Sequence, residues 1–388
     1  MKAKRTKSAM GKKLADKIKS TSRSPVKSRE SARIFAPTGS TLLNLACAND
    51  KDGGFQIGKI VTLPGGSSSG KTLLVITSLA ICNTIPFFDD YDFYYDDAEH
   101  ALEFDVGKYW GPTLEARMKA PAYDKEGEPL FSITIQDLQN NIISIAKKGK
   151  PFIYILDSFD SLSTSQELQK AFVAALGKAK SEEEIKDLKG SYKTEKAKIA
   201  GEILRMIKHE LKKTGSILIM VQQIRQKIGV SFGRQTTTSG GEAPYFYSTH
   251  QIWLTRIATH KKSGLKIGQR VKAEVGKNKV TGKERVVEFD VYDNYGVDDT
   301  CSCLEFLKAE NVLENATDPK GKTKPSTYVF EFGGHTPLEG TLGREGTLVR
   351  AIEEAREQGA IEALRDRVKE AWDAREASLV LNRRGRFE

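Results

Sequence analysis

The sequence has few cysteines and no long hydrophobic run. Its four cysteines are spread over 388 residues with no repeated spacing, which argues against a disulfide framework and indicates a reducing compartment. Cys301 and Cys303 have neither a second cysteine pair nor nearby histidines, so we expect no zinc site there. No apolar run approaches the roughly 20 residues that cross a bilayer, and residues 1–20 lack the apolar core of a secretory signal. We therefore expect a cytoplasmic protein with no membrane partner.

Positive charge is concentrated at the start of the chain. Residues 1–33 hold twelve Lys and Arg against two acidic residues, and the remaining sequence holds 49 of each sign, so the net charge of +10 belongs to this arm. A basic arm suits a polyanion such as nucleic acid, or it is a solvated tail that aids solubility, and composition leaves both open. A targeting segment is less favoured, because lysine outnumbers arginine in the arm.

Strands alternate with helices through the central part of the sequence. This pattern predicts an α/β fold with a mostly parallel twisted sheet flanked by helices. The buried strands are expected at KIVTL, DFYYDD, FIYIL and SILIMVQQ. Three later segments alternate like antiparallel strands that close the sheet, over 250–257, 271–278 and 286–293.

Three other segments differ from this pattern. Residues 163–200 are charged and helical in character. Residues 226–245 are rich in Gly, Thr and Ser without apolar periodicity, which predicts a mobile loop. From residue 299 we expect a smaller mixed unit, which ends in a long helical stretch over 345–374.

A glycine- and serine-rich loop follows the first buried strand and opens the predicted helix 71–81. It consists of Gly65, Gly66, Ser67, Ser68, Ser69, Gly70, Lys71 and Thr72 and matches the pattern G-x-x-x-x-G-K-[ST]. The backbone N–H groups of such a loop wrap a triphosphate, and the helix N-terminus favours its negative charge. Lys71 is expected to reach the β and γ phosphates, and the Thr72 hydroxyl to bind Mg²⁺. The loop therefore predicts ATP and Mg²⁺ as cofactors.

Acidic residues end two of the predicted strands. Asp157 follows the apolar run FIYIL, which is typical of the strand whose aspartate holds Mg²⁺ through water. The stretch DFYYDDAEHAL ends the preceding strand, and the carboxyl ends of such strands face the ligand crevice. Among its acids, Glu99 is long enough to orient a water that attacks the γ-phosphate. We expect Asp96 to be a solvated strand end and leave Asp97 undecided, whereas His100 is expected to pack or hydrogen-bond rather than to bind a metal.

The strand SILIMVQQ leads from a candidate sensor residue into the glycine-rich loop. Gln223 ends this strand, where its amide either responds to the γ-phosphate or only caps the strand. The loop combines cations, hydroxyls and glycines that suit a nucleic-acid backbone, although a plain surface loop is the alternative. Its candidate DNA-binding residues are Arg225, Gln226, Lys227, Arg234, Gly240 and Gly241.

The strings DDAEHALE, QQIRQKIGV-x-FG, TTTSGG and KNK, in this order behind GGSSSGKT, resemble the bacterial RecA recombinases. The resemblance covers roughly residues 35–300 and is specific, because many unrelated ATPases share the phosphate loop but not the other strings. It implies a RecA-type P-loop ATPase core that forms helical filaments on single-stranded DNA, hydrolyses ATP at subunit interfaces and exchanges strands with homologous duplex DNA. The departures from the family favour a divergent member, of the kind that a phage or mobile element encodes in a bacterial cell.

The resemblance assigns roles to residues of this sequence. Glu99 corresponds to the catalytic glutamate and Gln223 to the ATP-sensing glutamine. Lys277 and Lys279 correspond to the lysines that a neighbouring subunit inserts toward the γ-phosphate, and their i, i+2 spacing on a strand places them on one face. The residues that correspond to the family's two DNA-contacting arginines are Lys198 and Arg205, whose spacing also suits a solvated basic helix face.

Several departures bear on these roles. Gly66 and Ser67 replace a Pro-Glu pair of the family, and the family's adenine-stacking tyrosine is replaced near Val106. Extra length is expected around residues 165–190. We expect a basic arm with a possible subunit contact (1–36), an ATPase core (37–298) and a smaller C-terminal α/β domain (299–388). The alternative functions are a ring-forming helicase or translocase of the same superfamily and a recombination mediator without turnover.

Overall fold

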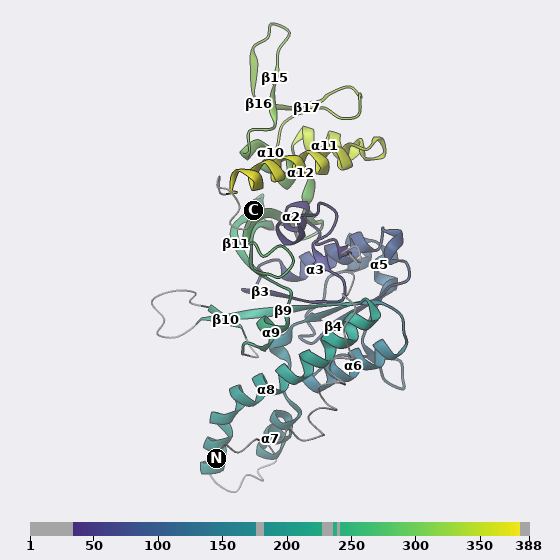
Figure 1. The fold of residues 1–388 in the computed structure, drawn as a ribbon, viewed down its shortest axis with the longest axis vertical. Coiled ribbons are helices and arrows are strands. Elements are labelled where there is room, and N and C mark those ends of the chain that lie inside the picture. The colour runs from purple at the N-terminus through teal and green to yellow at the C-terminus, as the bar shows by residue number, and fades with distance from the viewer. Residues whose placement is uncertain (1–33, 176–181, 227–235, 239–240, 381–388) are drawn as a thin grey trace, which may run out of the picture. The chain divides into compact units, whose positions relative to one another are not determined.

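The computed structural model describes residues 34–175, 182–226, 236–238 and 241–380. Its largest sheet has ten strands in the order β14-β13-β12-β11-β3-β9-β8-β4-β5, with β10 paired to β9 (Figure 1). The parallel strands at its centre are β3 (Ile60–Gly65), β9 (Ile217–Gln226), β8 (Phe152–Asp157) and β4 (Asp92–Asp97). Every residue of β3 and β8 is buried, which explains why these strands read as continuous apolar runs. The predicted α/β fold with a mostly parallel sheet is confirmed.

The antiparallel side of the sheet follows the predicted pattern. It consists of β11 (His250–Lys262), β12 (Leu265–Asn278), β13 (Arg285–Tyr292) and β14 (Gly296–Asp298). The first two strands are longer than expected because their pairing continues into an exposed hairpin beyond the buried part of the sheet.

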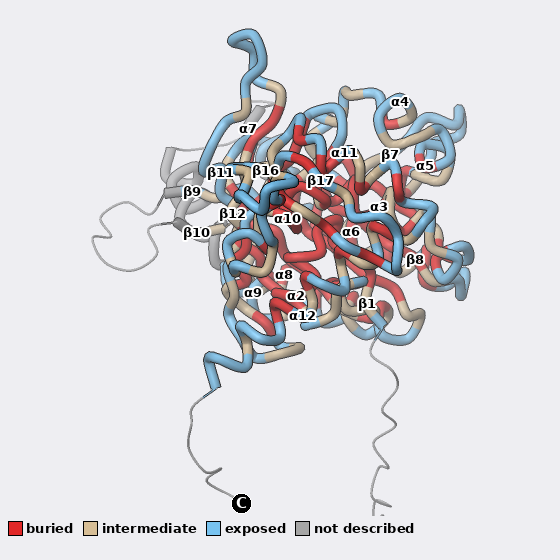
Figure 2. The backbone as a smooth tube through the Cα atoms, turned by 90° about the horizontal axis from the view of Figure 1, so that it is seen from above, coloured by how far each residue is buried: buried red, intermediate tan, exposed pale blue. Residues whose placement is uncertain are grey.

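Helices cover both faces of the sheet. On one face, α2 (Thr41–Ala48) and α3 (Lys71–Cys82) pack against the odd-numbered residues of the central strands. On the other, α6 (Ile135–Lys147) and α8 (Glu182–Thr214) pack against the even-numbered ones. This division follows from the period of two in a strand. Figure 2 shows the buried residues, in red, gathered in the interior, with exposed residues, in pale blue, mostly at the outer loops.

Short elements connect these layers. They are β1 (Phe35–Ala36), β2 (Phe55–Gln56), a 3₁₀ turn (Pro86–Phe88), α4 (Val106–Trp110), α5 (Pro112–Arg117), β5 (Met118–Lys119), β6 (Ala122–Tyr123), β7 (Pro129–Leu130), a second 3₁₀ turn (Phe159–Ser161), α7 (Ser165–Ala175), β10 (Thr236–Thr238) and α9 (Ala243–Tyr247). None of the helices in the described part of the chain is both long and apolar enough to cross a membrane.

Two predictions about the middle of the chain have different outcomes. The helical character expected for 163–200 is confirmed where the structure describes it, in α7 and α8. The expectation that 226–245 forms only a loop is wrong for β10, which pairs with β9, and for α9, which is helical. The β-branched run Thr236–Thr238 suits a strand, and its pairing with a distant segment could not be read from local periodicity.

After β14 the chain forms a group of helices and a small sheet. Its elements are α10 (Asp299–Ala309), β15 (Glu314–Thr317), β16 (Thr323–Phe330), β17 (Leu338–Gly340), α11 (Thr347–Glu354), a 3₁₀ turn (Arg356–Gln358) and α12 (Ala360–Ser378). The long helical stretch expected over 345–374 is confirmed as helical, and it is divided into α11 and α12 by the 3₁₀ turn. The helix is interrupted before Gly359, whose φ of 88° lies in the left-handed region that glycine adopts without strain.

Candidate functional site

The phosphate loop lies between β3 and α3, as predicted. Ser68 and Gly70 have φ values of 53° and 86°, which turn the loop sharply before the helix begins at Lys71. The Lys71 ammonium donates to the carbonyl oxygens of Gly65 at 3.0 Å and Gly66 at 2.7 Å. Burial lowers the pKa of Lys71, and the nearby carboxylates of Asp157 and Glu99 oppose this shift. The loop thus carries a cation at the start of a helix, which is a suitable arrangement for a polyphosphate.

Thr72 and Asp157 form the candidate metal-binding pair. The Thr72 hydroxyl donates to Asp157 Oδ2 at 2.7 Å, and the Tyr95 hydroxyl from β4 donates to the same oxygen at 2.8 Å. Burial raises the pKa of Asp157, and these two hydrogen bonds oppose the shift. The pair offers oxygen donors only, which fits the preference of Mg²⁺. The structure therefore brings together the two residues that were predicted to bind the metal.

Glu99 and Gln223 are in direct contact. Gln223 Nε2 donates to Glu99 Oε1 at 2.8 Å, Ser161 Oγ donates to the same oxygen at 3.3 Å, and Ser158 Oγ donates to it as well. The Gln223 backbone N–H donates to Asp160 Oδ2 at 2.7 Å, which holds the end of β9 against the turn that follows β8. The predicted catalytic and sensor residues, 124 positions apart in the chain, therefore share one hydrogen bond.

The other acids of DFYYDDAEHAL have structural roles. Asp96 is fully buried and accepts from the Tyr154 hydroxyl at 2.6 Å and from the Ser132 N–H at 2.8 Å. The prediction of a solvated strand end is therefore wrong for Asp96, because strand alternation turns it under α6. Burial raises its pKa, although these hydrogen bonds favour the charged form.

The turn after β4 is held by backbone contacts. Asp97 accepts from the N–H groups of Ala101 at 3.1 Å and Leu102 at 3.0 Å, which shapes the turn that carries Glu99. The ring of His100 packs edge-on against Phe131 with centroids 5.3 Å apart, so it packs as expected.

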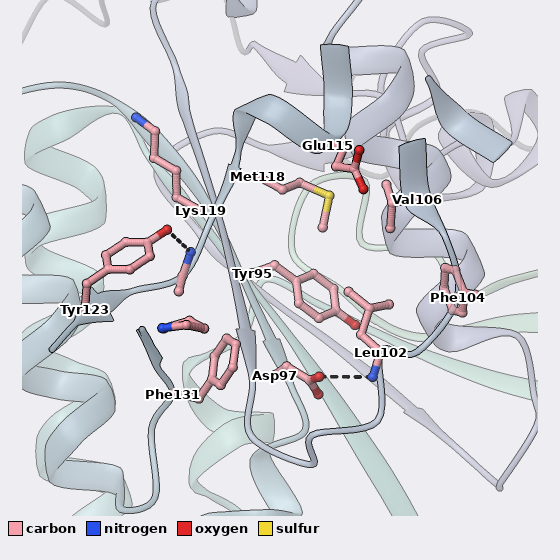
Figure 3. Close-up of a pocket in the computed structure, with 12 residues that line it drawn as sticks. Tyr95, Asp97, Leu102, Phe104, Val106, Glu115, Met118, Lys119, Tyr123 and Phe131 are labelled. Carbon is pink, nitrogen blue, oxygen red and sulfur yellow. Dashed lines mark hydrogen bonds between the residues drawn. The ribbon is translucent and has the colours of Figure 1, made fainter. Parts of the chain in front are cut away.

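A cavity of about 480 Å³ lies beside this turn, at the carboxyl ends of β4 and β5 (Figure 3). Its walls include Phe104 and Val106, in the segment where the family's tyrosine is replaced. Tyr95 and Asp97 also line it, so the cavity adjoins the candidate metal-binding pair through the Tyr95 side chain. It is separate from the phosphate loop, whose residues do not line it.

Lys277 and Lys279 reach the same short helix. Lys277 Nζ donates to the carbonyl oxygens of Tyr245 and Phe246, the latter at 3.2 Å, and Lys279 Nζ donates to Phe246 at 3.3 Å. Lys277 Nζ also lies 4.2 Å from the centre of the Tyr245 ring. Burial, together with the neighbouring charges of Lys279 and Lys208, lowers the pKa of Lys277 to about 8. Lys277 lies on β12 and Lys279 follows directly after its last residue, and both ammonium groups reach the Phe246 carbonyl oxygen.

The candidate DNA-binding residues lie on three elements. Lys198 and Arg205 are exposed on α8, and Arg225 is exposed on β9. Gln226 is the last residue of β9 and pairs with Thr236. Lys227, Arg234 and Gly240 lie outside the described residues.

Gly241 brings the end of the candidate DNA-binding loop against α8. It has a φ of 65°, and a Cβ atom added to it would lie 2.9 Å from the Ala197 Cβ. Ala243 of α9 lies next to Gly201 of α8, where an added Cβ would be 3.9 Å away. Small residues therefore allow the segment after the loop to approach the helix that carries Lys198.

Sequence reasoning missed three polar residues that support the site. Tyr95, Ser158 and Ser161 contact Asp157 or Glu99, yet none of them was singled out. Ser158 was the easiest to find, because a hydroxyl directly follows Asp157, the candidate metal-binding aspartate. Tyr95 looked like part of an apolar run, and only its position on a strand next to β8 reveals its partner.

Comparison with known proteins identifies the family of this chain. The family model of the RecA N-terminal domain matches residues 24–298. Protein RecA of Nostoc sp. is 31% identical over 277 residues, which cover 70% of this chain and 67% of that protein. Protein RecA of Aquifex aeolicus is 31% identical over 287 residues, which cover 72% of each chain, and Protein RecA of Chlamydia trachomatis is 31% identical over 282 residues. The chain therefore belongs to the RecA family.

Proposed function

We propose that the protein is an ATP-dependent recombinase that forms helical filaments on single-stranded DNA and catalyses homologous pairing and strand exchange. The observation that carries this proposal is the 2.8 Å hydrogen bond from Gln223 to Glu99. Gln223 lies on β9, which continues through Gln226 to the start of the DNA loop. One strand therefore connects the carboxylate of an ATPase site to a DNA-binding segment, as DNA-stimulated hydrolysis requires.

The described residues support a direct route for ATP hydrolysis. Lys71 and the N–H groups of the loop would bind the phosphates, and Thr72 and Asp157 would hold Mg²⁺, which neutralises charge on the β and γ phosphates when bound. Glu99 orients a water for attack on the γ-phosphorus and takes its proton as the bond to the ADP oxygen breaks. Gln223 holds Glu99 through Oε1, so Oε2 remains as the proton acceptor.

The DNA and the neighbouring subunit would use the remaining cations. Lys198, Arg205 and Arg225 are exposed and suit phosphate contacts, which position DNA without reading its sequence. Lys277 and Lys279 are proposed to reach the γ-phosphate of an adjacent subunit. The division into 1–36, 37–298 and 299–388 and a cytoplasmic location are part of the same proposal.

Gln223→Ala tests the proposal through its central contact. We expect this variant to bind ATP and single-stranded DNA while losing DNA-stimulated phosphate release, because Glu99 no longer responds to β9. The matched control is Ser161→Ala, which removes a longer hydrogen bond to the same oxygen and is expected to keep the stimulation. Normal stimulation in Gln223→Ala would contradict the proposal. Negative-stain images with a slowly hydrolysed ATP analogue add a second criterion, since open filaments are expected and closed rings would favour a helicase.

A further inference from the structure

Gln222 is a buried polar residue that the site described above does not use. Its side chain is fully buried, and no residue in the described part of the chain forms a hydrogen bond with its amide nitrogen or oxygen. Buried amides are normally hydrogen-bonded, because an amide removed from water without partners destabilises the folded state. An exception inside a central strand calls for an explanation, and use in another state of the protein is one.

Strand alternation turns Gln222 toward the proposed DNA-binding side of the sheet. Its neighbour Gln223 contacts Glu99 on one face, so Gln222 points to the opposite face, together with Met220. That face is covered by α8, and Tyr247 of α9 packs against the same core. These two helices carry or adjoin the residues proposed to contact DNA. The unpartnered amide therefore lies on the DNA side, and the next residue along the strand lies on the ATP side.

Gln222 is also close to the phosphate loop along the sheet. It pairs with Pro64 of β3, and Gly65, the first residue of the loop, pairs with Gln223. A small shift of this part of β9 would thus displace both the phosphate loop and the Gln223 side chain that contacts Glu99.

Gln251 provides a contrast on the same sheet. It is buried on β11, which pairs with the other edge of β3, but its amide oxygen accepts from Trp253 Nε1 at 3.0 Å. A buried amide in this part of the sheet can therefore be satisfied. Gln269 Oε1 on β12 and His250 Nδ1 on β11 also lack a partner among the described residues, but Gln222 is the buried amide there whose nitrogen and oxygen are both unpaired.

We propose that Gln222 is a positioning residue that couples DNA binding to ATP hydrolysis. When single-stranded DNA binds on the α8 and α9 side, the Gln222 amide gains hydrogen-bond partners there and fixes the end of β9. The hydrogen bond from Gln223 to Glu99, which already exists in the free protein, is thereby kept in place during turnover. This role rests on the proposed function and adds a residue that acts through Gln223 rather than on the substrate.

Gln222→Met tests the role, because methionine keeps the shape of the side chain and removes both polar atoms. In the free full-length protein we expect Tm to rise by about 1–3 °C, since an unpaired buried amide is removed. Phosphate release without DNA is expected to stay unchanged, whereas its stimulation by single-stranded DNA falls roughly tenfold. Gln222→Asn, which keeps an amide on a shorter side chain, is expected to retain more stimulation than Gln222→Met.

Gln251→Met is the matched control. It removes a partnered amide, so we expect a lower Tm with DNA stimulation retained. Wild-type stimulation by DNA in Gln222→Met would overturn the role of Gln222 but leave the proposed function intact. A lower Tm in Gln222→Met would do the same, because it would show that the amide has hydrogen-bond partners in the free protein. A wild-type protein whose ATPase ignores DNA would overturn the proposed function itself, and the coupling role with it.

Discussion

Replacing Glu99 by glutamine is expected to stop ATP turnover while the site stays assembled. Three donors converge on Oε1, from Ser158, Ser161 and Gln223, and no described residue donates to Oε2. Glutamine can place its carbonyl oxygen at Oε1 and keep these hydrogen bonds. Its amide nitrogen then lies where Oε2 was and cannot accept the proton of the attacking water. The substitution therefore removes the proposed general base and little else.

The size of the effect follows from this geometry. General base catalysis contributes about 10²–10⁴-fold, which corresponds to roughly 3–5 kcal/mol of transition-state stabilisation. Stability should change by less than about 1 kcal/mol, because the hydrogen bonds to Oε1 remain. Phosphate release with saturating single-stranded DNA measures turnover. A fluorescent nucleotide and DNA anisotropy show whether binding is retained. If Glu99→Gln binds both ligands and hydrolyses ATP at the wild-type rate, the role assigned to Glu99 is wrong.

Three further substitutions test other parts of the structure. Lys71→Ala should abolish phosphate release and weaken nucleotide binding in a titration, and retained turnover would exclude this loop as the phosphate site. Arg285 holds the pKa of Glu376 at about 2, below its ordinary 4.5. The ion pair therefore stabilises the folded protein at pH values above 4.5, and this stabilisation is lost as the pH falls toward 2. Glu376→Gln should therefore cost roughly 1 kcal/mol in denaturant titrations at pH 7, and a difference that persists at low pH would contradict the pairing. Gly241→Ala places a methyl against Ala197 at a φ of 65°, so it should lower the free energy of unfolding by about 1–2 kcal/mol and weaken DNA binding in an anisotropy titration. Unchanged DNA binding would show that this contact does not affect the proposed DNA-binding loop.

Much of the site could be predicted because its residues lie at fixed places in a repeated pattern. The phosphate loop needs glycines and a lysine at set spacing, and the acids at the ends of β4 and β8 face one crevice in any parallel sheet of this kind. Neighbouring parallel strands therefore bring Glu99, Asp157 and Gln223 together without any knowledge of the side-chain contacts.

The contacts that the sequence did not reveal depend on partners far away in the chain. Asp96 was taken for a solvated residue because nothing near it in the sequence shows that the hydroxyl of Tyr154, 58 positions later, donates to it. The break before Gly359 was not predicted because the apolar and charged residues around it continue the helical pattern, although α11 ends at Glu354 and α12 begins after Gly359. The unpaired amide of Gln222 could not be found from sequence, because it is defined by the absence of a partner within the described fold.

Strand exchange between circular single-stranded DNA and a homologous linear duplex tests the proposed function most directly. We predict that joint molecules form only when ATP and homology are both present, and that Glu99→Gln and Gln223→Ala each lower their yield over repeated turnover. ATP hydrolysis by the wild-type protein without any joint molecules, together with closed rings in negative stain, would contradict the assignment as a recombinase.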